Sequence, residues 1–514
     1  MKMKKIKAVP VFRLQRVWQS TAATVEGSSS VVTEYDKAKP FDEIPGPKGL
    51  PYIGTMLKYR KGPFGKYNID RYQESVVDLY QRYGKICKET IAGRTIVHLF
   101  DPDYIRTVFQ TEGKTPHVAP LMETTQLYRK QRGFSPGLGN TNGEEWYKLR
   151  SAVQQMMMRP KAVTVYLPFV TEVADDFIKR LKEIRDKSGH VKNLRNEISK
   201  WNVESAAMTV FEERLHCLSS GPDSEVQKMI DANSDMFTLS AKMKFQLPLY
   251  KMFETPTWKK LCMAEECVYK ISERYLNEAI SRISNLARNN ELEEGQYNFL
   301  TYLLGRPELD NRDVTIISLS LFGDGLSTTS PTLASNIYCL GRFQDAQEKV
   351  YQEIERVVPP GSQITAEMIN KMSYLKAFVK EAFRFFPIGL DVARIPQQNL
   401  TIGGYQVPAG TQIELNNFVM FNDPQYFDEP EEFKAERWLR DGSAQNIHPY
   451  ILTPFGHGPR MCAGRRFAEQ EMYVVIIKLL QNFRLEWTHS DLGQKYQILM
   501  VPNAPVDVTL HNRT

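Results

Sequence analysis

One cysteine near the C-terminus lies in the segment whose residue types best suit chemistry. Residues 455–464 read FGHGPRMCAG, and the two glycines and the proline before Cys462 exclude regular structure there. We expect a helix to begin near Gly464, and backbone N–H groups at a helix N-terminus stabilise a thiolate. Arg460 adds a positive charge that could pair with an anionic cofactor. The segment therefore predicts a thiolate beside a flat anionic cofactor; the alternative is an inert buried thiol.

The pattern FxxGxRxCxG is complete in this segment, at Phe455, Gly458, Arg460, Cys462 and Gly464. It resembles the haem-binding loop of the cytochrome P450 superfamily. The resemblance implies that Cys462 is the axial thiolate ligand of a haem b iron, and that its electron donation favours cleavage of the O–O bond. Phe455, Gly458 and Arg460 would belong to the cofactor-binding loop.

A glutamate and an arginine upstream extend the resemblance. Glu381 and Arg384 match the ExxR helix of the family, although spacing of i and i+3 alone indicates only a surface ion pair. In the family this pair is buried and holds the region near the haem loop. Arg437 resembles the third arm of that structure, whereas Ala435 stands where the family usually has proline.

Three further residues match contacts that the family makes with the haem propionates. Trp146 and Arg150 resemble its WxxxR helix, and Arg394 matches another propionate contact. With Arg460, the resemblance implies that these residues hold the cofactor.

Residues 318–340 resemble the oxygen-activating helix of the family, with one departure. Gly325 and Thr328 match the family pattern, but Ser327 occupies the position of its acid. Family members use the acid and the alcohol to relay protons to the oxygen that is being activated. The pair is therefore incomplete in this chain.

Two nearby residues could compensate for the missing acid. Asp324 lies one helical turn before Thr328 on the same face, and we expect it to supply protons to Thr328 and Ser327. Pro331 has no N–H, so the Ser327 carbonyl loses its helical donor and the helix should kink and admit water. The alternative is that Asp324 caps the helix or faces solvent.

Two lysines one turn apart, Lys376 and Lys380, indicate by spacing alone a solvated helix face. The chain also resembles animal mitochondrial members of the family, and in detail the arthropod ones. That resemblance implies that these lysines, with Arg466, dock an acidic 2Fe–2S ferredoxin. Electrons would then come from NADPH through a ferredoxin reductase.

The N-terminus is basic and rich in hydroxyl groups. Six basic residues precede the first acid, Glu26, and a Ser/Thr-rich run follows. This composition is typical of a mitochondrial transit peptide, and the alternative is a disordered basic tail. We expect a transit peptide over residues 1–35, a proline-rich lead-in over residues 36–51 and a haem-thiolate catalytic domain over residues 52–514.

The elements that must position these residues are mainly helical. Most windows over residues 146–380 have apolar residues at helical spacing, and a last helix is expected from Gly464 to about residue 480. A hairpin is expected over residues 86–100, with a capped helix starting at Asp101, and short strands over residues 392–415. We predict a mainly α fold with small β-sheets (α+β), formed by a single large helical domain. The resemblance implies the cytochrome P450 fold, with haem buried between the oxygen-binding helix and the cysteine-ligand helix.

Composition limits the class of partner. The net charge of +6 arises from 66 basic and 60 acidic residues without a dense basic block, which argues against nucleic acid. No run of about 18 uncharged apolar residues could span a bilayer. Residues 247–253 mix apolar and basic side chains and could rest on a membrane surface, unless they form a buried loop. The six scattered cysteines indicate neither a disulfide framework nor a zinc site.

We therefore expect a monooxygenase on the matrix side of the mitochondrial inner membrane, bound peripherally. Its substrate would be lipophilic: an ecdysteroid, another endogenous lipid or a foreign compound. Residues 113–133, 387–392 and 498–505 are expected to line the substrate pocket. One alternative is a haem-thiolate isomerase or dehydratase that does not use O₂, and the other is a non-catalytic haem-binding sensor or carrier.

Overall fold

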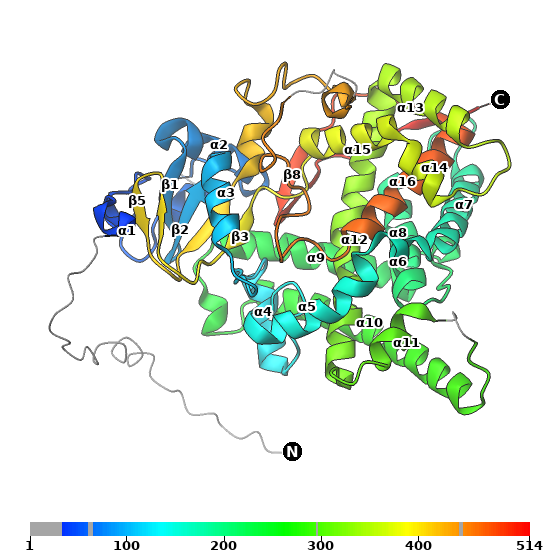
Figure 1. The fold of residues 1–514 in the computed structure, drawn as a ribbon, viewed down its shortest axis with the longest axis horizontal. Helices are drawn as coiled ribbons and strands as arrows, with labels where there is room; N and C mark the ends of the chain where they lie inside the picture. The colour runs from blue at the N-terminus through cyan, green and yellow to red at the C-terminus, as the bar shows by residue number, and fades with distance from the viewer. Residues whose placement is uncertain (1–32, 60–64, 294–296, 441–445, 514) are drawn as a thin grey trace.

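A group of strands lies on one side of the molecule and most of the long helices lie on the other. The computed structural model describes residues 33–59, 65–293, 297–440 and 446–513, so most of the expected transit peptide lies outside the described residues. In Figure 1, β1, β2, β3 and β5 lie on the left with α1, α2 and α3, and the longer helices lie on the right. The predicted mainly α fold with small sheets is confirmed.

The described residues form the following elements. The helices are α1 (Glu34–Lys37), α2 (Tyr72–Tyr83), α3 (Pro102–Thr111), α4 (Glu123–Arg132), α5 (Gly143–Met157), α6 (Pro160–Thr164), α7 (Leu167–Ile184), α8 (Leu194–Val210), α9 (Glu225–Lys244), α10 (Pro256–Arg288), α11 (Asn298–Leu304), α12 (Asn311–Arg342), α13 (Gln344–Val357), α14 (Ala366–Lys371), α15 (Ser373–Phe385) and α16 (Arg465–Asn482). The strands are β1 (Ile86–Ile91), β2 (Arg94–Leu99), β3 (Val392–Arg394), β4 (Leu400–Ile402), β5 (Tyr405–Val407), β6 (Gln412–Leu415), β7 (Phe483–Glu486), β8 (Gln494–Gln497), β9 (Leu499–Pro502) and β10 (Thr509–Asn512).

The predicted hairpin and the helix after it are both present. β1 and β2 pair antiparallel, with Ile91 opposite Arg94. Ala92 and Gly93 make the turn with φ of 50° and 80°, the left-handed backbone that a two-residue hairpin turn requires. Asp101 caps α3, because its side chain accepts hydrogen bonds from the N–H groups of Asp103 and Tyr104.

The largest sheet joins distant parts of the chain. Its strand order is β1-β2-β6-β3, and β2 runs parallel to β6, with Val97 opposite Ile413. The proline-rich lead-in packs against this sheet, since the Lys88 N–H donates to the Pro45 carbonyl at 2.8 Å. The sheet therefore carries residues from both ends of the chain to one wall of the interior.

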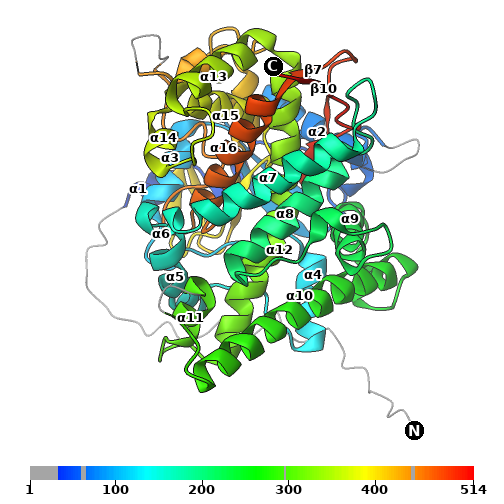
Figure 2. The same cartoon turned by 90° about the vertical axis from the view of Figure 1, so that its right-hand side faces the viewer.

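The helical side is built around α12. This helix packs against α8, α10 and α16, and from Thr329 to Gly341 every one of its side chains is buried. It stays α-helical through Pro331, so the expected disturbance does not interrupt the helix. Figure 2 shows α7, α8 and α16 close to one another on this side of the molecule. No helix among the described residues combines the length and low charge needed to cross a membrane.

Candidate active site

A cavity of about 780 Å³ lies between α12, the loop before α16 and the β2–β6–β3 sheet. Its wall includes most of the predicted cofactor-binding and proton-handling residues, namely Trp146, Arg150, Asp324, Thr328, Arg394, Arg460 and Cys462, but not Ser327. Parts of the three expected pocket segments line it as well, namely residues 118–124, residues 387–392, and Ile498 with Leu499. The structure thus brings together groups that lie more than 300 positions apart in the chain.

Cys462 lines this cavity immediately before α16. Gly456 and Gly458 have φ of 72° and 73°, which bends the loop back so that the Cys462 N–H donates to the Phe455 carbonyl at 2.8 Å. Burial raises the pKa of the Cys462 thiol, while hydrogen bonds from backbone N–H groups at the start of α16 and the charge of Arg150 act in the opposite direction. The thiol therefore faces the cavity beside groups that stabilise its anion.

Arg460 reaches into the same cavity and has an unsatisfied nitrogen. Its Nε donates to the Pro116 carbonyl at 2.9 Å and its Nη2 to the Thr141 carbonyl at 2.6 Å. Nη1 is buried and has no hydrogen-bond partner among the described residues. The guanidinium also lies 4.0 Å from the centroid of the Trp146 ring. Burial and the like charges of Arg394 and Arg150 lower the pKa of Arg460 to about 9.

Arg150 and Arg394 add positive charge to this wall. Arg150 is buried, its Nη2 contacts the Met158 sulfur at 2.8 Å, and its Nε has no partner among the described residues. Arg394 forms an ion pair with Glu112, a residue that the sequence analysis did not single out. Buried cations need compensating anions. The unsatisfied nitrogens of Arg150 and Arg460 therefore fit the two carboxylates of a haem.

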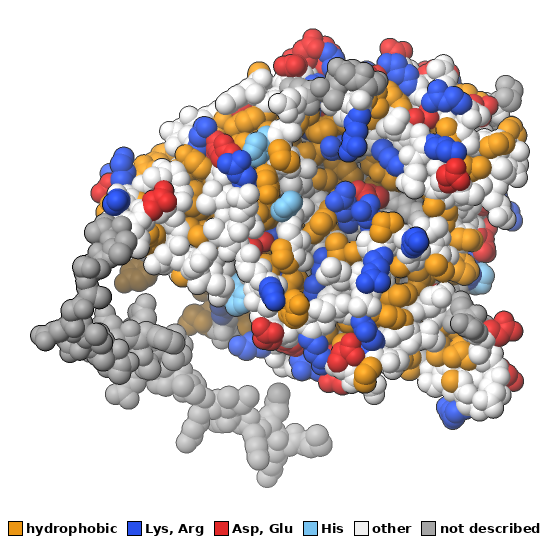
Figure 3. All heavy atoms as spheres, viewed as in Figure 1, with side chains coloured by type: hydrophobic (Ala, Val, Ile, Leu, Met, Phe, Trp, Pro, Cys, Tyr) orange, Lys and Arg blue, Asp and Glu red, His pale blue; other side chains and the backbone are white. Residues whose placement is uncertain are grey.

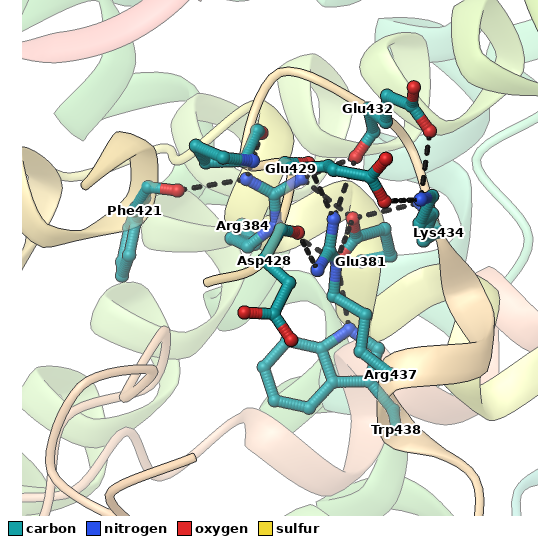
Figure 4. Close-up of polar contacts among 10 residues, drawn as sticks. Glu381, Arg384, Phe421, Asp428, Glu429, Glu432, Lys434, Arg437 and Trp438 are labelled. Carbon is teal, nitrogen blue, oxygen red and sulfur yellow. Dashed lines mark hydrogen bonds and ion pairs between the residues drawn. The ribbon is translucent and has the colours of Figure 1, made fainter. Parts of the chain in front are cut away.

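Glu381, Arg384 and Arg437 form a buried ionic cluster behind the cysteine loop. Arg384 donates to both carboxylate oxygens of Glu381, at 2.6 and 3.0 Å, and Arg437 Nε donates to Glu381 at 3.1 Å. The Trp438 indole also donates to Glu381, at 2.9 Å. Figure 4 shows the two arginines converging on Glu381, and Arg384 reaching the Phe421 carbonyl. The structure thus brings this predicted trio together.

Proline is not required for this cluster to form. Ala435, where the resemblance predicts proline, is fully buried, and the N–H of Lys434 before it donates to Glu381 at 3.0 Å. Phe455 links the cluster's helix to the cysteine loop, because its ring packs edge-on against Phe383 at 5.2 Å.

On α12, Asp324 and Thr328 line the cavity together. Burial raises the pKa of Asp324 to about 6, with Arg129 opposing and Glu265 adding to the shift. The Thr328 hydroxyl donates to the Asp324 carbonyl at 3.0 Å, and the Ser327 hydroxyl donates to the same carbonyl at 3.2 Å. Asp324 lies within α12 and is not its N-cap, and it lines the cavity with a pKa suited to proton exchange.

The expected docking residues lie on the outer side of α15 and α16. Lys376 is half-buried, whereas Lys380 and Arg466 are exposed. Lys380 Nζ lies 4.1 Å from the Trp438 ring centroid. Partial desolvation of its amino group lowers the pKa of Lys380, and so do the neighbouring charges of Arg440 and Arg465. In Figure 3, basic side chains gather over the region where Figure 1 draws α15 and α16.

Comparison with known proteins identifies the class. The cytochrome P450 family model matches residues 44–510, so the chain belongs to this family of haem-thiolate monooxygenases. The chain is 41% identical to "Probable cytochrome P450 CYP44" of Caenorhabditis elegans over 90% of its own length and 92% of the relative's. It is 32% identical to "Cytochrome P450 302a1, mitochondrial" of Drosophila melanogaster, over 93% and 96% of the two lengths. "Cytochrome P450 10" of Lymnaea stagnalis is also 32% identical, over 93% of this chain and 87% of its own.

The family binds haem through a cysteine thiolate, and the residues of this cavity fit that cofactor. Of the described residues, Cys462 is the only cysteine on the wall. Within the same part of the chain, the buried guanidinium nitrogens of Arg150 and Arg460 lack partners where an anionic group is needed. The sequence analysis missed Glu112, which pairs with Arg394. No local signal marks it, because the two residues lie 282 positions apart.

Proposed function

We propose that this protein is a mitochondrial monooxygenase that inserts one oxygen atom from O₂ into a lipophilic substrate, with electrons from a ferredoxin. The substrate class is an ecdysteroid, another endogenous lipid or a foreign compound. The observation that carries the proposal is the shared cavity: Cys462, Arg150 and Arg460 line the same space as Asp324 and Thr328.

Different residues of the chain are proposed to hold different parts of the cofactor. Cys462 would ligate the haem iron, and Arg150, Arg394 and Arg460 would bind its propionates. Trp146 supports Arg460 by stacking beneath its guanidinium. Haem, when bound, supplies the reductive activation of dioxygen. The Glu381–Arg384–Arg437 cluster fixes the segment behind the cysteine loop.

Residues of α12 are proposed to deliver protons. Asp324 holds a proton below about pH 6 and lies on the cavity wall one turn from Thr328. Because Ser327 cannot supply a proton as an acid does, Asp324 takes that role, and the hydroxyls of Ser327 and Thr328 pass the proton on. Each hydroxyl now donates to a backbone carbonyl, and each can rotate to donate elsewhere.

Electrons arrive at the basic face of α15 and α16. Lys376, Lys380 and Arg466 present positive charge there, which suits an acidic 2Fe–2S ferredoxin reduced by NADPH through its reductase. Several relatives are named as mitochondrial, and the basic N-terminal residues 1–35 are proposed as the transit peptide. These observations support the proposal that the protein is located on the matrix side of the mitochondrial inner membrane.

Reconstitution tests the proposal. The haem-loaded protein is incubated with a mitochondrial ferredoxin, its reductase, NADPH and a lipid and steroid extract. Products heavier by one oxygen atom are expected by mass spectrometry, and only with NADPH present. Products of unchanged mass formed equally without NADPH would instead identify an isomerase or dehydratase. Bound substrate without any product would identify a sensor or carrier.

Charge reversal tests the electron route separately. Lys376→Glu combined with Lys380→Glu should raise the ferredoxin concentration for half-maximal turnover by about tenfold, because like charges then face the partner. The matched control is Lys259→Glu with Lys260→Glu on α10, which lies across the molecule from α15 (Figures 1 and 2). Equal effects of the two double variants, at equal haem content, would contradict the proposed docking face.

A further inference from the structure

The end of the cavity formed by the sheet contains a polar cluster that the proposed chemistry does not use. The cluster consists of Lys244 at the end of α9, Asp391 before β3, Glu414 on β6 and Tyr496 on β8, and all four residues line the cavity. Much of the surrounding wall is apolar, including Ile388, Leu390, Ile498 and Leu499. A wall for a purely apolar substrate would not need two carboxylates.

Part of this cluster is satisfied internally. Lys244 Nζ donates to the Tyr496 hydroxyl at 3.1 Å and lies 5.2 Å from the Tyr72 ring centroid. His98, behind the cluster, places its Nδ1 3.3 Å from Glu414 Oε2. Burial lowers the pKa of His98, so this histidine is neutral and does not cancel a carboxylate charge.

The two carboxyl groups keep free acceptor capacity. No hydrogen bond or ion pair to the Asp391 side chain occurs among the described residues. Glu414 Oε2 lies against His98 but receives no hydrogen bond among the described residues. Its Oε1 accepts only a long hydrogen bond of 3.4 Å from Gln412. Burial and the charge of Glu414 raise the pKa of Asp391 to about 7. Buried acceptors left without donors are costly, so this part of the wall favours a ligand that brings donors.

We propose that the polar cluster anchors the head group of the substrate, and that this head group carries hydrogen-bond donors, as an alcohol or a protonated amine does. The carboxyls of Asp391 and Glu414 accept from the head group, while the rest of the substrate lies along the apolar wall. This inference rests on the proposed function, because it describes the substrate of the same cavity.

Binding of simple amphiphiles tests the anchor without turnover. The probes are 1-dodecanol against 1-methoxydodecane, and dodecylammonium against dodecyltrimethylammonium; only the first of each pair has a donor on its head. Affinities for the haem-loaded protein are measured by calorimetry. At least about a tenfold preference for a donor head is expected, as for hydrogen bonds to charged groups. The pair with the larger preference tells whether an alcohol or an amine is favoured.

Substitutions in the polar cluster test whether its carboxyl groups cause the preference for a donor head group. Asp391→Asn with Glu414→Gln should reduce it to within about twofold while leaving the affinity for 1-methoxydodecane unchanged. The matched control is Glu123→Gln, which removes another acid of the same cavity wall that already pairs with Arg94 at 3.1 Å. If the double variant does not fold, Asp391→Asn alone is used, because it breaks no hydrogen bond of the described residues.

Two results would overturn the anchor: equal affinity for both probes of each pair in the unmodified protein, or a preference that survives in the cluster variants. Neither depends on NADPH, ferredoxin or product. Failure of the anchor is therefore distinguishable from failure of the monooxygenase proposal, which the reconstitution detects.

Discussion

Glu381 connects α15 to residues 434–438 through one carboxylate. It accepts hydrogen bonds from Arg384 on its own helix, from Arg437 and Trp438, and from the backbone of Lys434. Both Glu381 and Arg384 are fully buried. Removing one partner from such a cluster leaves the remaining charge buried and uncompensated. Glu381 therefore holds together more of the structure behind the cysteine loop than the Glu381–Arg384 motif alone indicates.

Glu381→Gln is expected to destabilise the protein by about 3 kcal/mol, because two buried arginines lose their counter-charge. Chemical denaturation with haem absorbance and circular dichroism as signals measures this loss. Glu367→Gln is the control: it breaks an i, i+4 pair with Lys371 in which both side chains are exposed, and no measurable change is expected. A similar loss for both variants would contradict the role assigned to the buried cluster.

Individual site residues could be predicted from the sequence where they belong to a short motif. The cysteine loop, the ExxR pair and the WxxxR helix are short motifs, and the structure brings their residues to one cavity and the cluster behind it. Glu112 and the polar cluster could not be predicted, because their partners come from elements far apart in the sequence. Glu112 and the polar cluster stand out only because the fold buries charged groups there, and residue spacing does not reveal that burial.

Among the elements, α12 carries the chemistry that departs most from the family pattern. Its sequence predicts an oxygen-binding helix over residues 318–340, and the helix found, Asn311–Arg342, is longer at both ends. The Asp310 side chain starts it early by accepting from the Asp313 N–H, with the reciprocal bond completing a capping box. Past Pro331 the helix continues, because burial along its second half outweighs one missing hydrogen bond.

Asp324 should make turnover depend on pH. Because burial raises its pKa to about 6, Asp324 carries a proton below that pH and loses it above. The fraction of NADPH electrons that end in product is therefore expected to fall as pH rises through about 6. Asp324→Asn should give a low fraction with no such step. Product per NADPH, measured from pH 5 to 8 (about the range over which this group titrates), reports both effects.

Asp313→Asn provides the comparison on the same helix. Asp313 pairs with Lys148 at 2.5 Å in the first turn of α12, and it does not line the cavity. Its variant should keep the pH step of the unmodified protein. A step that persists in Asp324→Asn, or that disappears in both variants, would assign proton delivery to another group.

At the scale of the whole molecule, one exposed apolar segment predicts a surface that contacts a membrane. Residues 247–253 were expected to rest on a membrane or form a buried loop, and the structure exposes most of their apolar side chains: Leu247, Leu249, Met252 and Phe253. Met252 is 75% exposed and Phe253 is 57% exposed. Exposed apolar side chains beside Lys251 favour contact with an anionic lipid surface.

Met252→Ser with Phe253→Ser is expected to weaken binding to vesicles of phosphatidylcholine and cardiolipin by at least about tenfold, since two large apolar side chains no longer enter the lipid. Vesicle sedimentation measures the bound fraction. Met263→Ser on α10 is the control, because Met263 is 71% exposed but lies outside the segment. Equal weakening by Met263→Ser would indicate a different contact surface.

The parallel pairing of β2 with β6 has a consequence for how the molecule is made. Residues 96–99 have no partner strand on that side until residues 412–415 are available, and the cysteine loop follows a further 40 or so positions along the chain. Contacts between such distant segments form slowly. The N-terminal part of this sheet therefore stays incomplete until the C-terminal half of the chain has been synthesised. The cavity that fits haem is likewise complete only after these distant segments have met, because its wall takes residues from both halves of the chain.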